Sequence, residues 1–139
     1  IPRLLAALDP VGGPPADVVV GSRRVPGGRT EGWPLFRHLT SRLVGLFTRC
    51  LLGVPVRDPS SGYRAIRLAC FNRLGPPSTA GYAFHEELLW LVSRAGGRIV
   101  EVPITFHDRT SGASKAGLRE ITRASRDLIS LARRTWLGG

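Results

Sequence analysis

Apolar residues recur at helical spacing in several stretches of the chain. They predict helices over residues 1–8, 34–53, 84–95 and 118–136, and a helical turn or two over 70–74. The longest of these helices has one apolar stripe, made of Leu35, Leu39, Leu43, Leu46, Phe47 and Leu51.

Three stretches have the pattern of β-strands. Residues 17–21 form a short β-branched run between turn residues, which predicts a buried strand, and residues 63–67 predict a shorter one. Residues 98–106 alternate between apolar and polar positions, and Pro103 indicates an edge or a bulge there. Residues 22–32 and 107–117 are predicted to be polar loops. Strands that alternate with helices place residues 1–139 in the α/β class, as one domain.

Positive charge dominates the composition. The chain has 20 basic and 10 acidic residues, a net charge of +10, and all but one of the basic residues are arginine. Arginine forks match phosphate geometry, so this excess indicates a polyanionic partner. A GC-rich genome would also favour arginine over lysine, but such a bias does not explain the net charge.

Cysteine spacing and hydropathy exclude several classes of protein. Cys50 and Cys70 lie in apolar segments without metal-ligand spacing, so we expect reduced, buried thiols. The stretch 43–56 is interrupted by Arg49 and is too short to span a bilayer, and we expect no signal peptide. Any membrane contact is therefore expected to be peripheral.

Several cations lie where strands and helices meet loops. Arg23 follows a predicted strand, Arg37 and Ser41 are four residues apart on one helix face, and Arg109 and Lys115 flank a Gly/Ser loop. Ligands of α/β sheets bind at such loops, and helix N-termini favour phosphate. Any single arginine is more often a solvated surface charge, but three loops with cations favour an anion site.

Six motifs, in order along the chain, resemble the polyprenol-phosphate mannosyltransferases (dolichol-phosphate mannose synthases) of glycosyltransferase family 2. They are residues 19–24 (VVGSRR), 32–37 (GWPLFR) with Ser41, 57–64 (RDPSSGYR), 81–88 (GYAFHEEL), 101–104 (EVPI) and 106–115 (FHDRTSGASK). Each is weak alone, whereas the ordered series is specific and covers about residues 1–135.

The resemblance implies a Rossmann-like GT-A fold and transfer of mannose from GDP-mannose to dolichyl or polyprenyl phosphate, with Mg²⁺ or Mn²⁺. Two alternatives remain open: a related transferase that uses another nucleotide sugar such as UDP-glucose, and a non-catalytic basic module that binds anions. Nucleic acid is not an expected partner, because the tryptophans are scattered and no nucleic-acid-binding signature is present.

The resemblance also assigns residues to the two phosphate groups. It implies that Arg23, Arg37 and Ser41 bind the acceptor phosphate. It further implies that the loop containing Arg109, Ser114 and Lys115 closes on the donor phosphates, with Arg109 also catalytic.

Further residues are implied near the reacting centre. The resemblance implies that Asp58 is a catalytic residue, at the position where the family has an acidic residue near the reacting centre, with Ser61 and Gly62 shaping its turn. The alternative for Asp58 is a turn-forming residue before Pro59. Glu87 matches the family's Phe-Gln-x-Glu pattern, although a partner of the helix dipole is an equal alternative. His85 replaces the common glutamine of that pattern. His38 and His107 are expected to be surface polar residues, because neither has ligand-like spacing.

The family's nucleotide-binding unit and Asp-x-Asp metal motif have no counterpart in these residues, since no two of the five aspartates have that spacing. The chain is therefore expected to be the C-terminal part of a longer catalytic domain, to hold none of the main metal ligands, and to be inactive alone. The chain also contains no methionine.

The helix predicted over 118–136 is amphipathic. Its apolar side holds Ile121, Leu128, Ile129, Leu131 and Ala132, and its polar side holds Arg119, Arg123, Arg126, Arg133 and Arg134. This helix is expected either to lie against anionic lipid head groups or to be a solvated helix packed on the sheet. The resemblance implies a peripheral location on the cytoplasmic face of a membrane.

Overall fold

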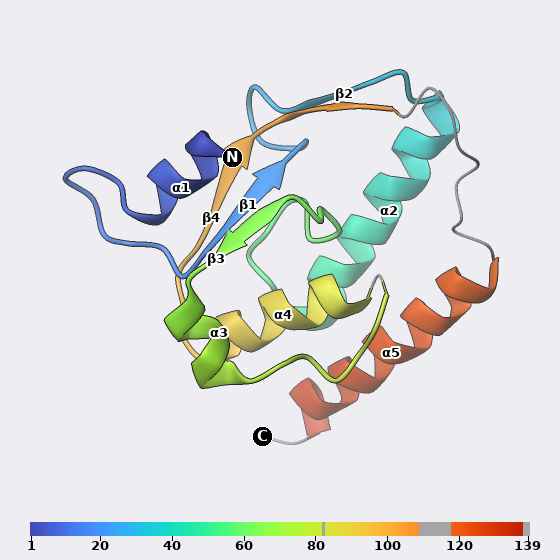
Figure 1. The fold of residues 1–139 in the computed structure, drawn as a ribbon. Helices are drawn as coiled ribbons and strands as arrows, with labels where there is room; N and C mark the ends of the chain where they lie inside the picture. The colour runs from blue at the N-terminus through green and yellow to red at the C-terminus, as the bar shows by residue number, and fades with distance from the viewer. Residues whose placement is uncertain (82, 109–117, 138–139) are drawn as a thin grey trace.

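The computed structural model describes residues 1–81, 83–108 and 118–137 (Figure 1). Helices and strands are interspersed along the chain, as the sequence pattern predicts, although β1 and β2, α3 and α4, and β4 and β5 follow each other directly. The elements are α1 (Pro2–Leu8), β1 (Val18–Ser22), β2 (Arg29–Glu31), α2 (Leu35–Leu52), β3 (Arg64–Ile66), α3 (Leu68–Leu74), α4 (Ala83–Arg94), β4 (Ile99–Pro103), β5 (Thr105–His107) and α5 (Leu118–Leu137).

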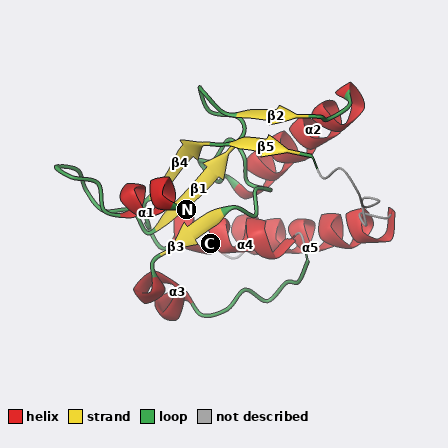
Figure 2. Ribbon diagram, turned by 45° about the horizontal axis from the view of Figure 1, so that its top comes forward, coloured by secondary structure: helices red, strands yellow, loops and turns green. Residues whose placement is uncertain are grey.

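The main sheet has the strand order β3-β1-β4 and is mixed. β1 pairs in parallel with β4 and antiparallel with β3. β2 and β5 form a second, parallel pair, which lies beyond the ends of β1 and β4 (Figure 2). The fold is therefore mixed α/β, as predicted.

The valines of β1 join two apolar cores, because successive side chains of a strand point to opposite faces. Val18 and Val20 pack on one face in a cluster with residues of α4, α5 and the C-terminal end of α2. Val19 packs on the other face, against α1. Every residue of β1 is buried, so β1 is the centre of the fold.

Two parts of the strand prediction are wrong in detail. The predicted polar loop 22–32 contains β2, a polar strand whose partner β5 is distant in sequence. The single strand predicted over 98–106 is divided after Pro103. At Ile104 the chain exchanges partners, since its N–H donates to the carbonyl of Ser22 and its carbonyl accepts from the N–H of Arg29.

Helix α2 has the predicted length, but five of the six residues of its apolar stripe are exposed, and only Leu51 packs partly against the core. Such a stripe ordinarily faces a core. Here the buried residues of α2 are Gly45, Thr48 and Leu52. The expectation for Cys50 is also wrong, because this thiol is exposed, whereas Cys70 is buried as expected.

Among the residues of α5 whose side chains are described, the predicted pattern holds except at Ile129. Leu128, Leu131 and Ala132 are buried, while Ile129 is 42% exposed. Arg123, Arg126 and Arg133 are exposed, as predicted for its polar side. No helix in the described ranges is long and apolar enough to cross a bilayer.

Two glycine substitutions test this packing. A Cβ at Gly21 in β1 would lie 2.6 Å from a ring carbon of Tyr63 and 2.9 Å from Ile104, so we expect Gly21→Ala to lower the free energy of unfolding by about 1–3 kcal/mol. Gly45→Ala in α2 meets nothing closer than 3.8 Å and should raise it by about 0.5–1 kcal/mol. Urea unfolding measures both. Equal effects of the two substitutions would contradict the close packing around Gly21.

Candidate functional site

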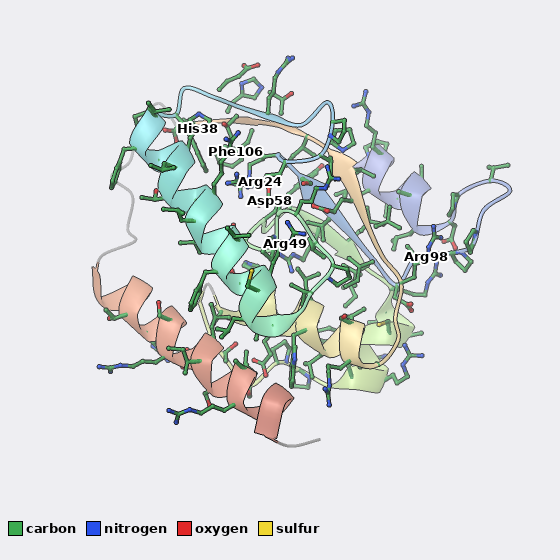
Figure 3. All side chains as sticks on the ribbon, turned by 180° about the vertical axis from the view of Figure 1, so that it is seen from behind. Arg24, His38, Arg49, Asp58, Arg98 and Phe106 are labelled. Atoms are coloured by element: carbon green, nitrogen blue, oxygen red, sulfur yellow. The ribbon has the colours of Figure 1, made fainter. Side chains whose placement is uncertain are left out.

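Arginines converge on a pocket of about 560 Å³ between α2 and the end of β1. Among the residues described, no acidic side chain lines it. Its lining is Arg23, Arg24, Gly28, Arg29, Thr30, Trp33, His38, Arg42, Leu46, Arg49 and Arg57. Figure 3 shows Arg24, Asp58 and Arg49 on the side of α2 that faces the sheet. A pocket lined by six arginines is suited to a polyanion.

A buried ion pair joins the end of β1 to the loop after α2. Arg23 donates from Nε to Oδ2 of Asp58 at 2.7 Å and from Nη2 to Oδ1 at 2.6 Å. The backbone N–H of Arg23 also donates to Oδ2, at 3.0 Å. The Asp58 side chain is 1% exposed and that of Arg23 is 10% exposed, so water screens this pair weakly. The two side chains fix each other's position.

This pairing determines the charge of Asp58. Burial alone would raise the pKa of Asp58, but the hydrogen bonds and the charge of Arg23 outweigh it and hold the pKa below its usual range. Asp58 is therefore ionised at neutral pH, with both oxygens occupied by Arg23. It acts here as more than a turn-forming residue.

Three other contacts hold the loop that contains Asp58. The carboxylate of Glu101 accepts the backbone N–H of Arg57 at 2.8 Å and that of Asp58 at 3.0 Å. Ser61 Oγ donates to the carbonyl of Gly21 at 2.6 Å. The guanidinium of Arg64 donates to the carbonyls of Pro59 and Ser61 within the loop. β1, β4 and the start of β3 thus fix the loop from three directions.

Ser41 is brought to Arg24, a residue that the sequence analysis did not select. Arg24 Nη2 donates to Ser41 Oγ at 2.8 Å. Burial, aided by the charges of Arg23 and Arg42, lowers the pKa of Arg24 against the attraction of Asp58. Its Nε is buried without a partner among the described residues. Arg24 thus has an unused donor beside the pocket.

Arg37 lies on α2 but is not among the residues that line the pocket. Its Nη1 donates to both carboxylate oxygens of Asp108, at 2.9 and 2.8 Å, and its guanidinium lies 4.4 Å from the centre of the Trp33 ring. Arg37 and Ser41 therefore share a helix face but have different partners. The predicted acceptor-binding roles of Arg23, Arg37 and Ser41 stay predictions.

The cations differ in how far their charge is balanced. Arg23 and Arg37 each have a carboxylate partner, and Arg29 has an exposed one in Glu31. Within the described ranges no carboxylate pairs with the four remaining arginines of the pocket. These four are Arg24, Arg42, Arg49 and Arg57. They are the charges that an anionic ligand would neutralise.

The two histidines expected at the surface differ. His107 is exposed and lies 3.0 Å from Glu31, as expected of a surface polar residue. His38 is partly buried and lines the pocket, within 3.1 Å of Thr30 Oγ1 and edge-on to Trp33, so the expectation for His38 is wrong. Its position depends on β2, which the sequence pattern does not reveal.

Glu87 and its neighbour Glu86 are both buried in α4. Glu87 accepts from Ser78 Oγ and from the backbone N–H of Thr79, both at 2.7 Å. Burial would raise the pKa of Glu87, but these hydrogen bonds lower it. In this structure Glu87 holds the loop before α4, and its predicted supporting role stays a prediction.

Glu86 has the opposite electrostatic balance. Burial raises its pKa to about 7, although the charge of Arg64 opposes the shift. Its Oε2 has no partner among the described residues, and the same holds for His85 Nδ1. Burial also lowers the pKa of Arg64 to about 10. His85 Nε2 would lie 3.4 Å from a Cβ at Gly62, so His85 sits directly beside the turn that follows Asp58.

The predicted donor loop, with Arg109, Ser114 and Lys115, lies outside the described residues. The described residues do not fit a divalent metal. They contain no group of three or more candidate ligands from His, Cys, Asp and Glu. Near the pocket, both oxygens of Asp58 are occupied by Arg23 and those of Glu101 by backbone N–H groups.

The sequence pattern did not single out Arg24 or Glu101. It also did not show that Arg24, Arg42, Arg49 and Arg57 lie together. Arg24 follows Arg23 directly, and both Arg24 and Glu101 lie within the six motifs, so the motifs could have indicated them. The convergence of Arg42, Arg49 and Arg57 depends on the path of the chain between α2 and β3. No local signal reports it.

No protein-family model matches the chain. It is 42% identical over 117 residues to an undecaprenyl-phosphate mannosyltransferase of Micrococcus luteus, covering 83% of this chain and 46% of that protein. It is 40% identical over 124 residues to a polyprenol monophosphomannose synthase of Mycolicibacterium smegmatis, covering 88% of this chain and 45% of that protein. The chain thus spans about half the length of the curated relatives it matches. These identities confirm the resemblance that the six motifs indicate.

The raised pKa of Glu86 predicts a pH-dependent stability. Its pKa is about 7 in the fold against an ordinary value of 4.5, so the fold binds a proton that the unfolded chain releases. Stability should therefore fall as pH rises from about 4.5 to 7, by on the order of 2–3 kcal/mol. We expect Glu86→Gln to remove this decline in urea unfolding at pH 5 and pH 8. The half-exposed Glu31→Gln is the control, and a decline that persists in Glu86→Gln would contradict the assignment.

Proposed function

We propose that this chain, a relative of the polyprenyl-phosphate mannosyltransferases, forms the acceptor-phosphate side of a glycosyltransferase. The reaction is transfer of mannose from GDP-mannose to a polyprenyl or dolichyl phosphate. The observation that carries this proposal is the arginine pocket, with four cations that no described carboxylate balances. The identities of about 40% to two named mannosyltransferases support it.

The chemistry of the reaction explains the need for fixed cations. An oxygen of the acceptor phosphate attacks the anomeric carbon of the donor sugar, and the bond from that carbon to the nucleoside diphosphate breaks. Both reactants are anionic and repel each other, so preorganised positive charge is needed to bring them together. The acceptor phosphate is already ionised at neutral pH, so no general base has to activate it.

The residues of the pocket have distinct parts in this proposal. Arg24, Arg42 and Arg49 bind the acceptor phosphate together with Arg23. Asp58 holds Arg23 in its orientation through two hydrogen bonds, rather than transferring a proton. Arg109, Ser114 and Lys115 bind the donor diphosphate, and Arg109 stabilises the charge of the leaving group.

Other parts of the proposal concern the complete protein. Its catalytic domain has a Rossmann-like GT-A fold and uses Mg²⁺ or Mn²⁺, held by residues other than those described here. The protein is attached peripherally to the cytoplasmic face of a membrane, where its lipid acceptor resides. The mixed α/β fold and the excess of arginine support these expectations.

A binding measurement tests the acceptor site. We expect the chain to bind a short prenyl phosphate, such as farnesyl phosphate, and Arg42→Gln/Arg49→Gln to weaken this binding about tenfold or more, as charge-assisted contacts are lost. Isothermal titration calorimetry measures both affinities. The control is Arg3→Gln/Arg94→Gln, which removes the same charge from two exposed arginines away from the pocket.

Two results would contradict the proposed acceptor site. One is equal weakening by the two double variants, which would indicate an unspecific effect of net charge. The other is salt-dependent binding of nucleic acid with no response to prenyl phosphate, which would favour a basic binding module.

A turnover assay tests whether the chain is sufficient for the reaction. With GDP-mannose, polyprenyl phosphate and Mg²⁺ or Mn²⁺, we expect no mannosyl lipid from this chain alone, because its described residues hold no metal-ligand group. Formation of product, detected by thin-layer chromatography, would overturn the expected inactivity. Product with UDP-glucose instead would identify a related transferase.

A further inference from the structure

Helix α2 presents an apolar surface to solvent. Seven large apolar residues of α2 are between 46% and 84% exposed, and we call them the α2 apolar surface. They are Leu35, Phe36, Leu39, Leu43, Val44, Leu46 and Phe47. The other exposed large apolar residues are dispersed over the rest of the described chain. Contiguous apolar surface rimmed by polar residues marks an interaction site rather than ordinary surface composition.

The helical period arranges three different sides around α2. At about 100° per residue, the α2 apolar surface occupies about half of the circumference. The buried residues Gly45, Thr48 and Leu52 lie on the opposite side, toward the rest of the fold. Between the two, along one border, lie His38, Arg42 and Arg49, which line the pocket. The same helix therefore carries the apolar surface and one wall of the arginine pocket.

We propose that the α2 apolar surface docks this chain on an anionic lipid bilayer. A helix with a broad apolar side and arginines at its border binds at the level of the head groups, apolar side toward the acyl chains. Arg42 and Arg49 at that border complement anionic lipid, and neighbouring α5 adds the exposed Arg123, Arg126 and Arg133. The positive charge at the border of the surface therefore favours an anionic bilayer over a protein partner that has few acidic residues.

The orientation follows from one shared residue. Leu46 belongs to the α2 apolar surface and also lines the pocket. With that surface on the bilayer, the pocket opens beside the head groups, where the phosphate of a lipid acceptor lies. This inference rests on the proposed peripheral attachment and names the surface that makes it. Figure 3 shows His38 and Arg49 of this helix and Arg24 beside it.

Vesicle binding tests the inference without any prenyl phosphate. We expect the chain to co-sediment with vesicles of phosphatidylcholine and phosphatidylglycerol, and more weakly with phosphatidylcholine alone. Leu39→Ser/Leu43→Ser should weaken partitioning about tenfold or more, because two leucines no longer enter the apolar layer. The matched control Leu5→Ser/Leu68→Ser replaces two leucines that are similarly exposed on α1 and α3.

Cys50 offers a readout at the surface itself. It is exposed and falls within the apolar half of α2, while Cys70 is buried. We expect anionic vesicles to slow the reaction of Cys50 with a water-soluble maleimide, both in the chain without substitutions and in the control variant. In Leu39→Ser/Leu43→Ser the vesicles should leave the rate unchanged.

The outcomes separate this inference from the proposed function. Equal vesicle binding by the two double variants, or Cys50 modification that vesicles do not slow, would overturn the role of α2. A dimer that Leu39→Ser/Leu43→Ser converts to monomer, without effect on vesicle binding, would assign the surface to a second copy instead. Prenyl phosphate binding is measured in solution and does not depend on these outcomes. A failure of the proposed acceptor site would therefore be recognised separately.

Discussion

The arrangement of the candidate site depends on the buried ion pair between Arg23 and Asp58. A buried carboxylate without a partner is costly, and the same holds for a buried guanidinium, so each residue requires the other. The pair joins the end of β1 to the loop before β3. Glu101 and Ser61 then hold that loop against β4 and β1. Because these contacts converge on one short loop, the position of Arg23 is fixed before any ligand binds, which is the condition for electrostatic preorganisation.

This constraint also explains how so many arginines lie together. Asp58 attracts Arg24 as well as Arg23, while Arg23 and Arg42 repel Arg24. One buried negative charge thus offsets part of the repulsion, and four arginines of the pocket remain without a described carboxylate partner. A polyanion would relieve the rest. The unbalanced positive charge that makes the pocket arginines repel each other is also what attracts an anionic ligand. The stability of this region is therefore connected to binding of the proposed acceptor.

Helix α2 connects the pocket to the outer surface of the molecule. Its buried side is narrow and consists of Gly45, Thr48 and Leu52, and a Cβ at Gly45 would make only ordinary contacts with Pro59 and the carbonyl of Arg57. This narrow contact leaves the large apolar residues free to face outward. The helix is anchored by few residues, carries two of the six pocket arginines, Arg42 and Arg49, along one border, and exposes apolar residues over about half of its circumference. Charge and hydrophobicity are thereby separated on a single element.

Most helices, the central strand, the charge and the family resemblance could be predicted from the amino-acid sequence. Helical period, β-branched runs and short motifs are local properties, so residues 17–21 and 84–95 could be assigned without a structure. Three features instead depend on how distant segments pack: β2 pairs with β5, Arg24 rather than Arg37 contacts Ser41, and His38 lines the pocket. The packing of distant segments also leaves Leu35, Leu39, Leu43 and Leu46 of α2 facing outward, while Leu52 is buried. Periodicity shows that a helix has an apolar side, but which side meets the core depends on the packing of distant residues, and that information is not local.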